Sequence, residues 1–460
     1  MACLGPFTLE VLETPTLGDR SYLVHDGTVA FVVDPQRDID RVEALLDAHD
    51  VRLLAVFETH VHNDYLTGGH ALAGRRGAAY LLNGDDDVAF ERTPLGDGET
   101  VPVGDRMRVT ALATPGHTFT HLAFALTDTD GDLGRALAVF SGGSLLFGAT
   151  GRPDLLGAEH TDELAHSQHR SAHRLAALLP ESAELLPTHG FGSFCAATQS
   201  GDATESTIGR ELRTNPALTR SEQEYVDEII GALDVWPAYY VHMPLANAAG
   251  PSAPDLGLPG RADAAELRRR LEAGEWVVDL RNRRTYAAGH LPGSYNFEVD
   301  GSFATYLGWL ITWGTPVTLL GESADQVAEA QRELVRIGID RPAAHATGTV
   351  EEWTDRPATF PTATFGELAR VRHHRPVVVL DVRRDPEHTE RHIEGAVHLP
   401  LHELLPRVEE LPDGEVWVHC ASGYRASIAA SLLAAAGHRV VAVDDDFDNA
   451  AEAGLPVVGS

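Results

Sequence analysis

Apolar and polar positions in the first 250 residues alternate between short apolar runs and segments with helical spacing. Residues 30–35 (AFVVDP) and 51–60 (VRLLAVFETH) have the β-branched and aromatic content of buried strands. Residues 40–49 (DRVEALLDAH), between them, have the apolar spacing of an amphipathic helix. Further strands are predicted within 108–118 and 136–143. The pattern therefore predicts layered α/β structure with polar residues at strand ends, where α/β proteins usually keep their active sites.

The remaining chain contains two similar segments of about a hundred residues each. Residues 277–296 (VVDLRNRRTYAAGHLPGSYN) match residues 379–398 (VLDVRRDPEHTERHIEGAVH), so that Asp, Arg, His and Gly recur at a constant spacing. Both segments alternate apolar runs with loops and helical patterns, which predicts two small α/β domains with parallel sheets. Stretches rich in Pro, Gly and Ala separate the segments and read as linkers. We predict three domains, at 1–250, 261–355 and 361–460.

Charge and composition narrow the class of protein. The 460 residues include 36 basic and 68 acidic side chains, a formal net charge of −32, and all the basic side chains are Arg. Without Lys, P-loop and Schiff-base chemistry are excluded, and the negative charge argues against binding to nucleic acid or anionic membranes. We expect a cytoplasmic protein without a membrane span or secretory signal. The three cysteines do not form a disulfide framework, and a homo-oligomer is compatible with the sequence.

A cluster of potential metal ligands follows the predicted strands of the first domain. His60, His62 and Asp64 stand at alternate positions after one strand, and His117 (TPGHT) and His189 (PTHGFGS) occupy similar settings later in the chain. Chelation requires several donor atoms that converge on one ion, and turns at strand ends can supply them. A single His is more often a satisfied core or surface residue, whereas this set predicts a metal site.

The series H-x-H-x-D, T-P-G-H and a late strand-end His resembles the metallo-β-lactamase fold, an αββα sandwich with a metal at the edge of its sheets. Together with GRPDLLG (151–157) and the downstream repeats, the series resembles the persulfide dioxygenase branch of that fold. The resemblance implies one Fe(II), with a low-molecular-weight thiol persulfide and O₂ as substrates. Tyr65 stands where dinuclear members have a His, in agreement with a single metal. Gly143 stands where the family has a further Asp ligand, and glycine cannot ligate through a side chain.

Three interpretations of the metal site therefore stay open. His60, His62 and His117 can hold one metal as a three-His set, or Asp64 or His189 can complete the shell. Alternatively, the domain has lost its metal and serves as a binding module. The competing chemistry is zinc-dependent hydrolysis of a thioester, as in glyoxalase II, because histidines alone do not choose between iron and zinc.

A second chemical signal is the cysteine loop VWVHCASGYRAS, where Cys420 lies between an apolar strand and a predicted helix. Such a loop directs backbone N–H groups inward at a helix N-terminus, which stabilises a thiolate or persulfide, and Arg425 adds a cation. The spacing C-x-x-G-x-R-A resembles the rhodanese active-site loop, which implies that Cys420 carries sulfane sulfur as a persulfide. By this resemblance the persulfide is cradled by Ala421, Ser422, Gly423, Tyr424 and Ala426.

The middle repeat also resembles a rhodanese domain, but it has GESADQ (321–326) in place of the cysteine loop and is expected to be catalytically silent. Cys195, in HGFGSFC, can lie near the metal cluster, although a small buried side chain is the simpler interpretation. The sequence thus predicts an enzyme of sulfur metabolism and sulfide detoxification. By these resemblances the enzyme would oxidise a thiol persulfide to sulfite and transfer sulfur among persulfide, sulfite and thiol through Cys420. Because Lys is absent, Arg425 and Arg152 are the expected cations for these anions.

Overall fold

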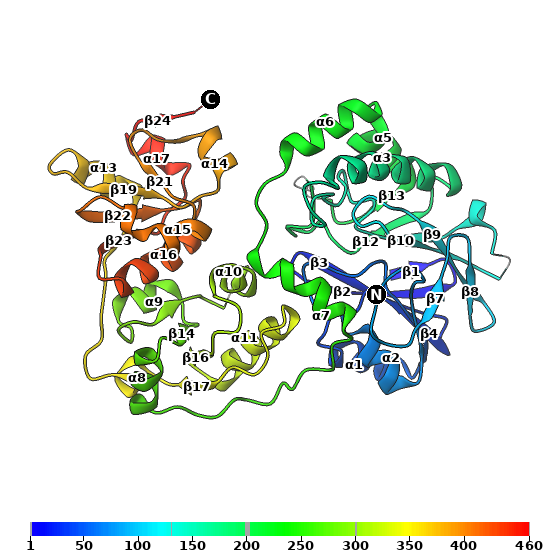
Figure 1. The fold of residues 1–460 in the computed structure, drawn as a ribbon, viewed down its shortest axis with the longest axis horizontal. Helices are drawn as coiled ribbons and strands as arrows, with labels where there is room; N and C mark the ends of the chain where they lie inside the picture. Colours follow the sequence, from blue (N-terminus) through cyan, green and yellow to red (C-terminus); the bar gives the residue numbers. More distant parts are fainter. Residues whose placement is uncertain (1, 130, 198–202, 300, 460) are drawn as a thin grey trace. The chain divides into compact units, whose positions relative to one another are not determined.

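The computed structural model describes residues 2–129, 131–197, 203–299 and 301–459. The chain forms two compact units, drawn in Figure 1. One comprises Met1–Pro254 with Val335–Gly338, and the other comprises Asp255–Leu334 with Ile339–Ser460. In the part of the chain that is described, no helix is both long enough and apolar enough to span a bilayer.

The first unit contains two β-sheets with helices on their outer faces (Figure 1). In spatial order the first sheet consists of β1 (Ala2–Leu4), β2 (Phe7–Thr14), β3 (Asp19–His25), β4 (Val29–Val33), β5 (Arg52–Phe57), β6 (Ala79–Asn83) and β7 (Thr93–Leu95). The second consists of β13 (Ser206–Thr207), β12 (Glu184–Pro187), β11 (Ala138–Gly142), β10 (Leu122–Thr127), β9 (Met107–Ala113) and β8 (Thr100–Val103). Residues of α1 (Asp40–His49) and α2 (Gly69–Arg76) pack on the first sheet. The second sheet is covered by α3 (Thr161–Leu178), α4 (Ile208–Thr214), α5 (Pro216–Thr219) and α6 (Glu222–Ala232). This αββα order confirms the predicted metallo-β-lactamase sandwich.

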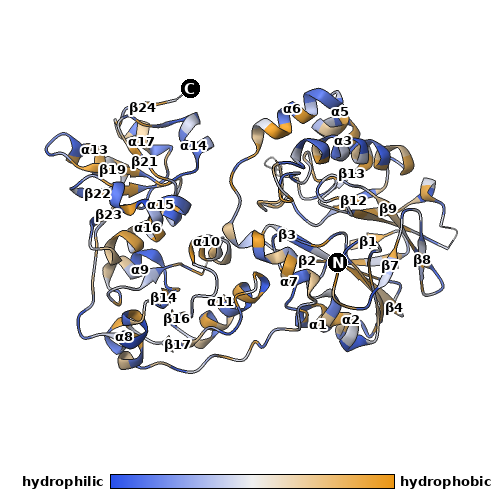
Figure 2. Ribbon diagram, viewed as in Figure 1, coloured by the Kyte–Doolittle hydropathy of each residue, from blue (hydrophilic) through white to orange (hydrophobic). Residues whose placement is uncertain are grey.

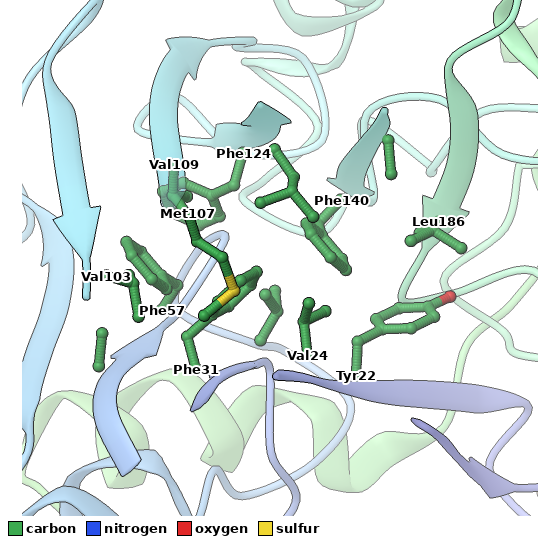
Figure 3. Packing of buried hydrophobic residues seen from close by; sticks show 14 of the residues in the cluster. Tyr22, Val24, Phe31, Phe57, Val103, Met107, Val109, Phe124, Phe140 and Leu186 are labelled. Atoms are coloured by element: carbon green, nitrogen blue, oxygen red, sulfur yellow. The ribbon is translucent and has the colours of Figure 1, made fainter. Parts of the chain in front are cut away.

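The core of the first unit lies between the two sheets. Figure 3 shows Phe31 and Phe57 of the first sheet facing Phe124 and Phe140 of the second. The ring centroids of Phe57 and Phe124 are 5.0 Å apart, a separation at which aromatic pairs add about 0.5–1.5 kcal/mol beyond their buried area. The outer faces of the same strands pack against helices, so that β4 is buried throughout. In Figure 2 the covering helices α3 and α6 carry both hydrophobic and hydrophilic residues, as amphipathic helices do.

Four connections of this unit meet at one edge of the sandwich. The chain leaves β5, β11 and β12 there, and the turn from β9 to β10 is at the same edge. Two backbone hydrogen bonds join these connections, because Leu122 N–H donates to the Thr59 carbonyl at 2.8 Å and Thr188 N–H donates to the Gly142 carbonyl at 3.1 Å. The predicted metal ligands therefore lie on connections that the two sheets bring together.

The second unit contains two parallel sheets, as the repeat predicts. The first has the order β15 (Tyr295–Asn296), β14 (Trp276–Asp279), β16 (Val317–Gly321) and β17 (Ala344–Thr347). The second has the order β18 (Thr362–Ala363), β23 (Arg439–Val443), β22 (Glu415–His419), β19 (Val378–Asp381) and β21 (Val397–His398). A short antiparallel pair is formed by β20 (His392–Ile393) and β24 (Val457–Val458). The helices are α8 (Ala264–Glu272), α9 (Arg283–Ala288), α10 (Phe303–Leu310), α11 (Ala324–Arg336), α12 (Val350–Trp353), α13 (Phe365–Arg372), α14 (Asp385–Glu390), α15 (Leu404–Arg407), α16 (Tyr424–Ala435) and α17 (Asn449–Glu452).

The two repeats also share a buried ion pair. Arg281 Nε and Nη2 donate to the Asp279 carboxylate at 2.9 and 2.6 Å, and Arg383 makes the same bonds to Asp381 at 2.9 and 2.6 Å. Each carboxylate is buried and would be costly to leave unpaired. The matching Asp-x-Arg motifs in the sequence therefore mark equivalent strand ends.

Candidate active sites

Four histidines converge at the edge of the first unit's sandwich. His60 and His62 follow β5, His117 lies between β9 and β10, and His189 follows β12. The ring centroid of His60 is 4.2 Å from that of His62, 4.8 Å from that of His117 and 5.4 Å from that of His189. All four side chains are buried. The structure thus brings together the four histidines singled out in the sequence.

In His117 and His189, Nδ1 is engaged by the protein and Nε2 faces the cluster. The Nδ1 atom of His117 is 2.9 Å from the Arg152 carbonyl oxygen, and its buried Nε2 has no hydrogen-bond partner among the described residues. The Nδ1 atom of His189 is 2.9 Å from the Asp19 carboxylate, and its Nε2 is 3.5 Å from Nε2 of His60. Metal-binding histidines usually have their second nitrogen fixed in this way, because that bond sets the tautomer and the ring orientation.

His62 faces the cluster with the opposite nitrogen. Its Nε2 lies 3.0 Å from the Tyr65 hydroxyl and 3.2 Å from the Glu58 carboxylate, whereas its buried Nδ1 has no hydrogen-bond partner in the described chain. Burial lowers the pKa of His62, but the neighbouring Asp34 and Glu58 outweigh that effect and raise it to about 9. Tyr65, which stands where dinuclear members of the family have a His, therefore orients His62.

Asp64 lies beside His189, with its Oδ2 3.2 Å from Nδ1 of the histidine. Burial favours the neutral acid, but the attraction to His189 outweighs it and holds the pKa of Asp64 below its ordinary value. Its buried Oδ1 has no hydrogen-bond partner among the described residues. Asp64 can therefore offer a charged oxygen to the cluster.

The donor set fits a metal ion. Potential ligand atoms lie within 4.8 Å of one another in four groups among the described residues: His60, His62 and His189; His117, His189 and Cys195; Asp19, Asp64 and His189; and Asp34, Glu58 and His62. The buried Nδ1 of His62 and Nε2 of His117 have no protein partner in the described chain, and such orphaned nitrogens are costly unless something binds them. Imidazole and carboxylate donors suit iron and zinc alike, so the donors do not name the metal.

Gly143 packs directly against the cluster. A Cβ atom at this position would overlap with the His117 ring. The Gly143 N–H donates to Nε2 of His121 at 3.0 Å, and Nδ1 of His121 lies 2.8 Å from Thr114 Oγ1. The sequence interpretation omitted His121, which stands four residues after His117. Since both of its nitrogens have protein partners, His121 supports the loop instead of offering a free donor.

We expect Gly143→Asp to lower metal affinity about tenfold or more, instead of adding a ligand, because the new Cβ would displace the His117 ring. Gly143→Ala is the matched control, since it introduces the Cβ without the carboxylate and should lose affinity similarly. Titration of the metal-free proteins with Fe(II) and Zn(II) measures the effect. Tighter binding by the Asp variant than by the parent would contradict this steric account.

Arg152 does not provide the expected free cation for an anionic substrate. Its Nε and Nη2 donate to the two carboxylate oxygens of Asp154 at 2.7 Å each, and its Nη1 donates to the Phe194 carbonyl at 3.3 Å. The side chain is almost fully buried. The structure therefore corrects the sequence expectation, because this guanidinium holds loops in place and its charge is paired.

Cys420 lies where β22 ends and the chain turns into α16. Its side chain is buried, and the Gly423 N–H donates to Sγ at 3.2 Å. Gly423 has φ of +93°, and a Cβ there would overlap with Asp444, so the turn requires glycine. The strand, loop and helix are thus arranged as the sequence predicts, with the N-terminus of α16 beside the thiol.

Arg425, the second expected cation, is also paired. Its two Nη atoms donate to the two carboxylate oxygens of Glu387 at 2.6 Å each. Glu387 lies on α14, and the sequence interpretation did not identify it. Arg425 remains beside the loop, where burial lowers its pKa, and Glu387 together with Tyr306 and Cys420 raises the pKa overall. The pair fixes the guanidinium and offsets its charge.

The predicted cradle residues differ in their contacts. Gly423 and Ala426 are buried, Ala421 is half-buried and Ser422 is exposed. The Tyr424 hydroxyl donates to the Glu298 carbonyl of the first repeat at 3.0 Å. A small pocket next to the loop is lined by Tyr306, Trp309, Leu310, Val382, Arg384, Leu401, His402 and Arg425. The first repeat therefore helps to wall the surroundings of Cys420.

In the first repeat the side chain of Gln326 holds the loop after β16 through two hydrogen bonds. The Glu322 N–H donates to Oε1 of Gln326 at 2.8 Å, and the amide nitrogen of Gln326 donates to the Leu280 carbonyl at 3.1 Å. The backbone N–H that could face a sulfur anion is thereby occupied. That the first repeat is catalytically silent stays a prediction.

Comparisons with known proteins agree with both halves of this description. A rhodanese-like domain model matches residues 263–356 and 364–453. The first half is 31% identical over 242 residues to a hydroxyacylglutathione hydrolase of Synechococcus sp. (strain JA-2-3B'a(2-13)), a match that covers 49% of this chain and 94% of the relative. It is 28% identical over 239 residues to the mitochondrial persulfide dioxygenase ETHE1 of Homo sapiens, covering 50% and 83%. A crystal structure of a metallo-β-lactamase from Staphylococcus aureus subsp. aureus COL matches with a TM-score of 0.66 and 25% identity, covering 75% of this chain and 100% of that one.

Proposed function

Since the chain belongs to the metallo-β-lactamase-fold family of hydroxyacylglutathione hydrolases and persulfide dioxygenases, with two rhodanese-like domains after that fold, we propose that it oxidises a thiol persulfide and transfers its sulfur. The first reaction converts a persulfide RSSH, O₂ and water into the thiol RSH and sulfite. The second moves sulfane sulfur through Cys420. The observation that carries the proposal is the presence in one chain of a metal-type histidine cluster and a loop suited to a sulfur anion.

In the first unit, His60, His62 and His117 would hold the metal, and Asp64 or His189 would complete its shell. When bound, Fe(II) would supply positions for a sulfur ligand and for O₂. The protein contributes burial, which keeps water from a reactive intermediate. It also contributes orientation, since Tyr65 and Glu58 hold the ring of His62.

In the second unit, the Cys420 thiolate would attack the terminal sulfur of a thiol persulfide. The S–S bond of the substrate breaks, the thiol leaves, and the sulfane sulfur stays on Cys420 as a persulfide. The Gly423 N–H, 3.2 Å from Sγ, faces the sulfur and stabilises its negative charge. Sulfite can then attack the sulfane sulfur, forming thiosulfate and restoring the thiolate.

Oxygen uptake tests the first reaction. We expect the iron-loaded chain to consume O₂ with glutathione persulfide and to form one sulfite for each O₂ consumed. Zinc-loaded protein is the matched control and should consume none, because zinc has no redox chemistry. Hydrolysis of a glutathione thioester by the loaded protein, without O₂ uptake in the iron form, would overturn the dioxygenase assignment. That result would support the hydrolase alternative, which the similarity to hydroxyacylglutathione hydrolases favours.

A further inference from the structure

We propose that Cys195 is a thiolate ligand of the metal centre and supplies the anionic donor that Gly143 lacks. The inference builds on the metal site of the proposed function, but it does not depend on which reaction that site performs. Cys195 stands six residues after His189 and is fully buried. Its Sγ lies within 4.8 Å of ligand nitrogens of His117 and His189, which also lie within 4.8 Å of each other.

The surrounding donors point to an ion in the same place. Nε2 of His117 and Oδ1 of Asp64 are buried and have no hydrogen-bond partner among the described residues. An ion bound between the His117, His189 and Cys195 donors, at about 2.0–2.3 Å from nitrogen and sulfur, would satisfy Nε2 of His117. The thiol itself lies near the Asp64 carboxylate and the Tyr240 hydroxyl. Burial and the carboxylates of Asp64 and Asp19 raise the pKa of this thiol well above its ordinary value, so the thiolate forms only when a bound cation replaces the proton.

The backbone holds Cys195 and His117 against the same peptide segment. The Arg152 N–H donates to the Cys195 carbonyl at 2.8 Å, and the Arg152 carbonyl is 2.9 Å from Nδ1 of His117. The Cys195 N–H in turn donates to Ser193 Oγ at 3.1 Å. Both polar backbone groups of Cys195 are therefore fixed, and its side chain has a defined position beside the histidine. Such support is what a ligand requires from its surroundings.

A Cys195 thiolate would bring the same charge to the metal centre as the carboxylate that other family members have at the position of Gly143. A carboxylate at position 143 would give the centre one negative charge, and a Cys195 thiolate gives the same charge from another loop. The thiol proton is released when the metal binds, because the ligand is the thiolate. The resulting donor set of imidazoles and one thiolate is softer than a set with a carboxylate and suits both zinc and iron.

Cobalt substitution tests this assignment directly. We expect Co(II)-loaded parent protein to show a sulfur-to-cobalt charge-transfer band in the near ultraviolet. Cys195→Ser should lose this band and bind the metal about tenfold or more weakly. Cys3→Ser and Cys420→Ser are matched controls, since each removes one of the other two cysteines, and both should keep the band. A band that persists in Cys195→Ser, or that disappears in Cys420→Ser, would overturn the proposal.

A second measurement does not require a Cys195 variant that folds. In the Cys3→Ser/Cys420→Ser double variant, Cys195 is the remaining cysteine. X-ray absorption of its zinc-loaded form should show one sulfur at about 2.3 Å from the metal. A shell of nitrogen and oxygen alone would overturn the proposal even if the iron form consumes O₂. Conversely, the protein could show a sulfur ligand and yet consume no O₂. That result would contradict the proposed dioxygenase function but support Cys195 as a ligand.

Discussion

Replacement of Cys420 with Ser is expected to reduce sulfur transfer at least about a thousandfold, because the hydroxyl that replaces the thiolate is a far weaker nucleophile at neutral pH. The measurement is thiosulfate formation from sulfite and a thiol persulfide. Cys420 Sγ accepts one backbone hydrogen bond from Gly423 and fills a small buried space, both of which a serine can do. The loss should therefore occur without unfolding, as a thermal unfolding curve close to that of the parent would show.

The matched control for this variant is Cys3→Ser. Cys3 is an exposed free thiol on β1 of the first unit, so its removal tests for non-specific thiol chemistry without altering the loop. We expect its rate of thiosulfate formation to equal that of the parent. Transfer that survives in Cys420→Ser would show that the persulfide is carried by another thiol and would contradict the assignment of this loop.

Replacement of His117 with Ala is expected to lower metal affinity at least about a hundredfold and to remove O₂ uptake with a thiol persulfide. The physical reason is the loss of an imidazole whose Nε2 has no other hydrogen-bond partner in the described chain and whose Nδ1 is already fixed by the Arg152 carbonyl. Even mutations of residues that only support a ligand typically cost 10–100-fold in affinity, so removal of a ligand should cost at least as much. Elemental analysis after dialysis, together with direct titration, measures the change.

His121→Asn is the matched control for this variant. His121 is a buried histidine of the same cluster, 5.0 Å from His60 between ring centroids, but both of its nitrogens have protein partners. We expect this variant to lose some stability and to retain the metal stoichiometry of the parent. If His121→Asn loses metal as completely as His117→Ala, the ligand set assigned here is incorrect.

The sequence predicts most accurately those features that depend on neighbouring residues in the chain. Residues close together in the sequence determine some strand ends and turns directly. One example is the buried strand followed by His62 and Asp64 at alternate positions. Another is the strand followed by Cys420 and, three residues later, Gly423. Local sterics account for this, as Gly423 shows, because a positive φ and a crowded Cβ position leave room only for glycine at that turn. The two parallel-sheet repeats could be predicted for the same reason, since their matched Asp-x-Arg pairs are two residues apart.

The sequence predicted where Arg152 and Arg425 lie better than it predicted whether their charges are free. Arg152 and Arg425 appear in the sequence as cations available to an anionic substrate, but the folded chain pairs Arg152 with Asp154 and Arg425 with Glu387. Even the nearby Asp154 could not be assigned, because sequence spacing does not show whether a side chain faces its neighbour or solvent. In a protein with a net charge of −32, buried arginines are almost always near a carboxylate, and only the packing selects which one.

The amino-acid pattern alone is sufficient for layered α/β structure, the two repeats, the metal-type histidines and the cysteine loop, because each arises from periodicity or from residues within one turn. The αββα sandwich was predicted from the resemblance to the metallo-β-lactamase fold. Folding adds the contacts between distant segments. It brings Cys195 to His117 and sets Glu298 of the first repeat against Tyr424 of the second. Spacing along the chain cannot encode such contacts, since they depend on how strands pair and helices pack. The approach of the Cys195 thiol to within 4.8 Å of ligand nitrogens of His117 and His189, on which the proposed thiolate ligand rests, is one of these non-local properties.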